Sequence, residues 1–113
     1  MRLRTQHEFA AVFQQQHRLS ENGFSAAFSR NELAFARLGL SIAKRHIKHS
    51  HDRNRVKRLI REAFRHEKDN LAGLDIVIMV KYPIAERSKD EMSVCIKRLL
   101  QKLERQLKQS STA

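Results

Sequence analysis

The alternation of apolar and polar residues predicts three β-strands. Residues 24–29 alternate Phe24, Ala26 and Phe28 with Ser or Ala, which is typical of an edge-like strand. Residues 38–42 alternate Leu or Ile with Gly and Ser, and a hairpin is the economical pairing of these two strands. Residues 75–80 form an almost continuous, β-branched apolar run, which predicts a central strand covered on both faces.

Helical spacing of apolar residues predicts helices near both ends of the chain. The motif Thr5-x-x-Glu8 resembles a capping box and opens a predicted helix over residues 6–16. The motif Ser88-x-x-Glu91 resembles a second capping box, and an apolar stripe follows it. This stripe consists of Met92, Ile96, Leu99, Leu100, Leu103 and Leu107. We expect the tail after Lys108 to be frayed.

A third, longer helix is predicted between Asp52, a plausible N-cap, and residues 70–73. At about 100° per residue, its apolar positions fall on one arc, which comprises Val56, Leu59, Ile60, Ala63 and Phe64. The opposite arc comprises Asn54, Lys57, Arg58, Arg61, Arg65 and Lys68. The order of elements, α-β-β-α-β-α, predicts an α+β fold in which one sheet packs with helices, as a single domain over residues 1–113.

Charge changes how the polar arc is interpreted. The chain carries 23 Lys and Arg against 12 Asp and Glu, a formal net charge of +11. Residues 44–68 hold ten Lys or Arg and three acidic residues, a local balance of 10 − 3 = +7. A solvated helix face is the usual explanation for such an arc, but a face that is merely soluble normally mixes signs. The asymmetry favours a nucleic-acid partner, and charge alone leaves RNA and DNA open.

Other candidate chemistry is weak. The lone Cys95 is expected to be a buried thiol on a helix, and the chain shows no signal peptide or membrane-spanning run, so we expect a cytoplasmic protein without a membrane partner. His46, His49 and His51 could suggest a metal site, but no Cys pair or carboxylate cluster completes a ligand set. We therefore expect no metal site, and the sequence contains no nucleotide-binding glycine motif or nucleophile elbow.

One string of residues is more specific than composition. Residues 53–65, RNRVKRLIREAFR, closely resemble the signature of the bacterial ribonuclease P protein family. The resemblance continues upstream through residues 37–45, RLGLSIAKR, and downstream through residues 73–78, GLDIVI. Residues 46–52 lack the Gly that some members carry after the paired basic residues, which puts loop contacts in doubt rather than the family.

The resemblance implies a fold like the second domain of ribosomal protein S5, in which the basic helix makes a left-handed crossover between parallel strands, against the usual rule. It also implies contacts between that helix and a catalytic RNA subunit. The residues that carry over are Arg53, Asn54, Arg55, Lys57, Arg58, Arg61 and Arg65, and Lys44 and Arg45 extend the patch.

A second site is implied on the open face of the sheet, where family members hold the single-stranded 5′ leader of precursor tRNA. Phe9 and Phe13 would border this cleft, and Ser41 would line it with other small residues. Exposed rings there could stack on unpaired bases. Periodicity alone instead places both Phe residues in the core.

The function implied is that of an accessory subunit that helps a catalytic RNA to remove the 5′ leader from precursor tRNA. Hydrolysis would belong to the RNA, with Mg²⁺ as its metal, and no obligate protein partner is evident. The competing hypotheses are a structural ribosomal or other RNA-binding protein, a DNA-binding regulator and a protein nuclease.

Overall fold

The computed structural model describes residues 17–81 and 87–111, with side chains described as far as residue 107. The elements are the strands β1 (His17–Glu21), β2 (Phe24–Arg30), β3 (Arg37–Ser41) and β4 (Leu74–Val80), the helices α2 (Ser50–Glu67) and α3 (Lys89–Ser111), and the 3-10 turn η1 (Lys68–Leu71). The α+β class is confirmed. The predicted helix over residues 6–16 lies outside the described residues.

The strands form one sheet in the order β1-β2-β4-β3. Strand β4 lies inside the sheet, antiparallel to β2 and parallel to β3, so the predicted central strand is confirmed. The predicted hairpin between residues 24–29 and 38–42 is wrong, because β4 separates β2 from β3. Strand β2 is also not an edge strand, since β1 pairs along its other side.

The hairpin partner of β2 is β1, which the hydrophobic pattern did not predict. Its sequence, HRLSE, is mostly polar and mostly exposed at the edge of the sheet. The turn that joins the two strands consists of Asn22 and Gly23, which both have positive φ, 47° and 97°. Asn-Gly is the residue pair that tight hairpin turns favour, so a local signal for this pairing was present in the sequence.

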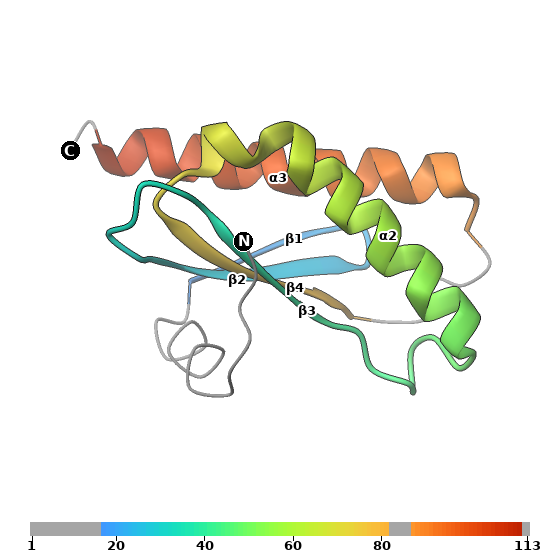
Figure 1. The fold of residues 1–113 in the computed structure, drawn as a ribbon. Helices are drawn as coiled ribbons and strands as arrows, with labels where there is room; N and C mark the ends of the chain where they lie inside the picture. The colour runs from blue at the N-terminus through green and yellow to red at the C-terminus, as the bar shows by residue number, and fades with distance from the viewer. Residues whose placement is uncertain (1–16, 82–86, 112–113) are drawn as a thin grey trace.

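Helix α2 connects the parallel strands β3 and β4 across one face of the sheet. In Figure 1 the chain runs from left to right along β3, returns above the sheet through α2, and runs from left to right along β4 behind β3. This path turns counterclockwise as it recedes from the viewer, which makes the crossover left-handed, as the family resemblance implies. Such connections are rare among parallel βαβ units.

Both helices cover the same face of the sheet (Figure 1). Val56, Ile60 and Phe64 of α2 are buried in one core cluster with the alternate β4 residues Ile76 and Ile78. The predicted stripe of α3 belongs to this cluster as well, and Leu107 packs against it partly buried. Cys95 is a buried free thiol, as expected. No described helix is long and apolar enough to cross a membrane.

The helix ends differ in how well the sequence predicts them. The N-cap of α2 is His49, not Asp52, and it makes no side-chain capping hydrogen bond. Asp52 lies instead in the first turn, where a negative charge is favourable near the helix N-terminus. At α3, the Ser88 Oγ accepts a 3.1 Å hydrogen bond from the Glu91 backbone N–H, which confirms the predicted cap. Helix α3 continues to Ser111, past Lys108, where the sequence pattern predicts fraying.

We predict that Ile60→Asp unfolds the domain. Ile60 is fully buried, and an unpaired carboxylate at this position should cost at least about 4 kcal/mol of the free energy of unfolding. The matched control is Gln101→Asp on the exposed face of α3, which should melt near the wild-type temperature. Thermal unfolding followed by circular dichroism compares the two variants. A cooperative wild-type melt for Ile60→Asp would mean that the faces of α2 are misassigned.

Candidate nucleic-acid interface

The face of α2 that points away from the core carries the predicted basic residues. Burial of Val56, Ile60 and Phe64 turns the opposite arc to solvent. Most of the arc is exposed, namely Asn54, Arg58, Arg61, Arg65 and Lys68, while Lys57 is half-buried. Arg55, which lies outside this arc, is exposed as well. The structure therefore leaves most of the predicted RNA-contact residues of the helix accessible, whereas Arg53 and Lys57 are half-buried.

Arg58 and Arg61 are the cations most available to a ligand. Both are exposed and lie three residues apart on the helix. Neither forms a hydrogen bond or ion pair with any described residue. A planar guanidinium can engage a phosphate bidentately or stack on a base, so both groups can meet a polyanion without first breaking a bond seen within the described chain.

Arg53 has a structural task that the sequence did not indicate. Its side chain is half-buried, and its Nη1 donates hydrogen bonds of 2.9 Å to the carbonyl oxygens of Ile47 and Lys48. Ile47 is fully buried, so its side chain attaches the loop to the core. Arg53 holds the backbone of the same loop. Arg53 thus orders the entry to α2, whatever further contact it makes.

Arg65 differs from Arg58 and Arg61 because its charge is compensated. Its Nη2 lies 2.6 Å from Oε1 of Glu62, with both side chains well exposed. The hydrogen bond and the positive charge of Arg65 lower the pKa of Glu62 below its usual value, so the carboxylate stays ionised in neutral solution. This pair reduces the positive potential at the C-terminal end of α2.

Lys44 and Arg45 are exposed in the turn that follows β3. Backbone hydrogen bonds from His46 and Ile47 to the Ala43 carbonyl hold this turn. The chain proceeds from there directly into α2, so both cations lie at the N-terminal approach to the basic face. Within residues 17–81 and 87–111, no group of three His, Cys, Asp or Glu side chains is placed to hold a metal ion.

Of the residues predicted for the leader site, only Ser41 lies within the described part of the chain. Ser41 is exposed at the end of β3. Ser25, Ala27 and Ser29 of β2 are buried, so the row of small residues is not uniformly accessible. Phe9 and Phe13 lie outside the described residues, and their place at this face stays a prediction.

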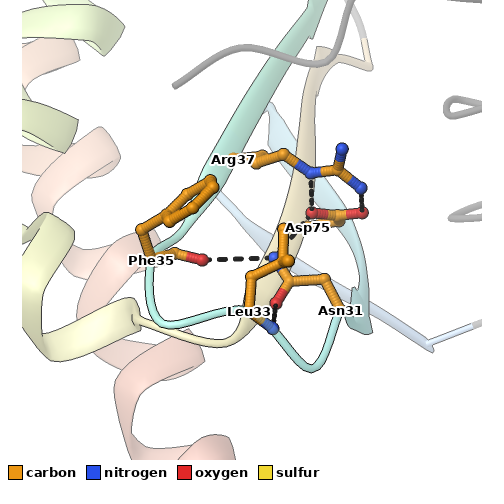
Figure 2. A network of polar contacts seen from close by, with 5 residues as sticks. All are labelled: Asn31, Leu33, Phe35, Arg37 and Asp75. Atoms are coloured by element: carbon orange, nitrogen blue, oxygen red, sulfur yellow. Dashed lines mark hydrogen bonds and ion pairs between the residues drawn. The ribbon is translucent and has the colours of Figure 1, made fainter.

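A polar network on the same face was missed by the sequence reasoning (Figure 2). Asp75 is buried, and Arg37 contacts it through two hydrogen bonds, Nε to Oδ1 at 2.8 Å and Nη2 to Oδ2 at 2.6 Å. Asn31 donates a third hydrogen bond, of 2.8 Å, from Nδ2 to Oδ1. A charged residue in a strand predicted to be covered on both faces requires partners, and this rule would have pointed to the network.

Comparison with known proteins gives a consistent family. The family model described as Ribonuclease P matches residues 1–104. The "Ribonuclease P protein component" of Yersinia enterocolitica is 37% identical over 99 residues, covering 88% of this chain and 83% of that protein. The protein of the same name from Blochmanniella floridana is 39% identical over 105 residues, covering 93% and 82%. The structure of the Staphylococcus aureus RNase P protein has a similar fold, with a TM-score of 0.81 and 24% identity, covering 88% of this chain and 92% of that one.

We predict that Arg53→Ala destabilises the domain by about 1–3 kcal/mol, because it leaves the Ile47 and Lys48 carbonyl groups without their charged donor. The control, Arg55→Ala, removes the same charge two positions further along the helix from an exposed side chain without a described partner. Urea unfolding should give a lower midpoint for the first variant and little change for the second. Equal urea midpoints for the two variants would show that the hydrogen bonds of Arg53 to the loop carbonyls contribute nothing to stability.

Proposed function

The chain belongs to the ribonuclease P protein family, and from this premise we propose that it binds the catalytic RNA of ribonuclease P through the exposed face of α2. The family match spans residues 1–104 of 113, so the chain is a protein component of that enzyme. The proposed interface rests on the exposure of Arg58 and Arg61, two cations without a described partner. The opposite face of their helix is buried in the core.

The proposed surface extends along the whole of α2. Arg55, Lys57 and Asn54 lie toward its start, and Lys44 and Arg45 lie on the approach to it. Cations along one helix can neutralise successive phosphates and release the counterions that those phosphates condense, which makes the affinity strongly salt-dependent. Arg53 contributes by holding the approach in place, and Arg65 contributes less charge because of Glu62.

We further propose that the chemistry belongs to the RNA, with Mg²⁺ held there, and that the protein binds the 5′ leader of precursor tRNA. The proposed role of the chain is to offset repulsion between the two RNAs and to raise affinity for a substrate that still has its leader. The family supports this proposal, and a net charge of +11 suits it. The proposed compartment is the cytoplasm, where precursor tRNA would meet the enzyme.

Reconstitution tests the proposed function directly. The protein is added to bacterial ribonuclease P RNA at low Mg²⁺, and cleavage of the 5′ leader is followed over time. We expect a large rise in the cleavage rate over RNA alone. A protein that binds the RNA but leaves the rate unchanged would be a structural RNA-binding protein instead.

We predict that Arg61→Ala, and separately Arg58→Ala, weakens binding to the catalytic RNA and reduces its salt dependence. Each lost phosphate contact should lower the slope of log affinity against log salt by about 0.7–0.9. The matched control is Arg98→Ala, which removes an exposed Arg from α3. Filter binding at several salt concentrations provides the slopes. If the salt-dependence slopes of Arg58→Ala and Arg61→Ala equal that of the control Arg98→Ala, the interface does not lie on α2.

We predict that Phe13→Ala weakens binding of precursor tRNA by the reconstituted enzyme and leaves mature tRNA binding nearly unchanged. Only the precursor carries a leader, and a lost base stack should cost on the order of 1–3 kcal/mol. If Phe13 is a core residue instead, truncation should cost roughly 3–5 kcal/mol of folding stability. Affinities for both tRNAs, measured beside the melting temperature, separate these outcomes, since a core defect depresses all of them together.

A further inference from the structure

The loop between β2 and β3 exposes two large apolar side chains close together. Leu33 is 39% exposed and Phe35 is 41% exposed. Within the described residues, only one other large hydrophobic side chain, Val94 on α3, is comparably exposed. Scattered single apolar residues on a surface are ordinary. Two in one short loop form a small exposed apolar surface whose hydration is unfavourable.

This loop is held rigidly by the network of Figure 2. Asn31 is its centre: Nδ2 donates to the Phe35 carbonyl at 3.2 Å and to Asp75, while Oδ1 accepts from the Leu33 N–H at 2.8 Å. Asp75 is fixed in turn by Arg37. The carbonyl of Phe35 points into the network and its ring lies outside it (Figure 2). The exposed ring is therefore presented by an ordered backbone.

The backbone of the loop also stores strain. Glu32 has φ 60°, a left-handed conformation that residues with a side chain adopt uncommonly. Such a conformation persists only where surrounding contacts impose it, and it is found more often at binding loops than elsewhere. Here the hydrogen bonds of Asn31 on one side and of the Phe35 carbonyl on the other impose it.

Backbone hydrogen bonds attach the loop to the segment that follows α2. Gly73 donates to the Phe35 carbonyl at 3.3 Å, and its own carbonyl accepts from the Asn31 N–H at 2.9 Å. Gly73 follows η1, which continues directly from the end of α2. Figure 1 shows the loop below the C-terminal end of α2. The exposed Lys68, the first residue of η1, lies directly beyond that end of the helix, and Arg65 lies in its last turn with its charge partly compensated by Glu62.

From this arrangement we propose that Phe35 stacks on an unpaired base of the RNA that α2 binds. The inference rests on the proposed function and adds an aromatic contact at one end of the interface. An aromatic ring beside a basic helix suits a nucleotide, because the cations hold the phosphates while the ring covers the base. A second copy of the chain suits this surface poorly, since each copy carries a net charge of +11 and the copies repel one another.

The experiment uses the absence of Trp from the sequence. Phe35→Trp places the only tryptophan of the chain in the loop, where it can be excited selectively over the one Tyr. Val94→Trp places the tryptophan near the start of α3 instead, and this helix begins at the other end of the sheet (Figure 1). Each full-length variant is titrated with bacterial ribonuclease P RNA, and filter binding follows complex formation independently. We expect saturable quenching and protection from acrylamide for Phe35→Trp, and neither for Val94→Trp.

Phe35→Ala and Asn31→Ala complete the test. Phe35→Ala should weaken RNA binding roughly five- to fiftyfold with little change in melting temperature, because the ring is exposed. Asn31→Ala keeps the ring and frees the loop, so it should weaken RNA binding less, together with a fall in stability. A Phe35→Trp complex that forms by filter binding without a fluorescence change overturns the stacking inference and leaves the proposed function intact. No complex for the wild-type chain overturns the proposed function itself. Concentration-dependent protection of the fluorophore without RNA assigns the loop to self-association and also overturns the inference.

Discussion

The packing of Val56, Ile60 and Phe64 into the core determines where the basic residues of α2 lie. These side chains recur every four residues and share one cluster with Ile76 and Ile78 of β4. Since each residue of a helix turns by about 100°, burying this stripe leaves no freedom for the opposite arc, which must face solvent. The position of the proposed binding surface is therefore a consequence of core packing. The core can hold the helix because the face of β4 that carries Leu74, Ile76, Ile78 and Val80 is entirely apolar.

Charge acts against this arrangement when the chain is alone. A formal charge of +11 on 113 residues repels itself, and such repulsion destabilises a compact state. The described acidic partners relieve only part of it: Asp75 engages Arg37, Glu62 engages Arg65, and Glu21 engages Lys102. A bound polyanion would remove the rest, and any ligand that binds only the folded form adds to its stability. An RNA that binds only the folded chain would therefore also stabilise the fold.

The sequence predicts the helices and strands that local periodicity defines. It does not predict strand pairing, which depends on contacts between residues far apart in the sequence. The spacing of apolar residues locates β4, α2 and α3 and assigns the faces of both helices correctly. It cannot show that β4 inserts between β2 and β3, because strand pairing depends on tertiary contacts that alternation does not encode. The hairpin that does form had a local signal in its turn residues, Asn22 and Gly23. Its first strand, β1, is mostly polar, so the alternation of apolar and polar residues does not predict it. The family string assigns RNA contacts to the cations of α2, and this stays a prediction. The hydrogen bonds of Arg53 could not be predicted, because they depend on where the loop places the Ile47 and Lys48 carbonyl oxygens.

The segments on either side of α2 are held by hydrogen bonds to backbone carbonyls, which lowers the entropy cost of binding at these two places. At its start, Arg53 fixes the loop that leads from Lys44 and Arg45 into the helix. Beyond its end, Gly73 and Asn31 fix the loop that presents Phe35. Ordering a flexible segment at an interface consumes part of the interaction free energy, and here the described backbone at both ends is ordered before a partner arrives. The long side chains of Arg58 and Arg61 remain the parts that must lose freedom, so affinity for the proposed RNA partner should depend chiefly on phosphate contacts and salt.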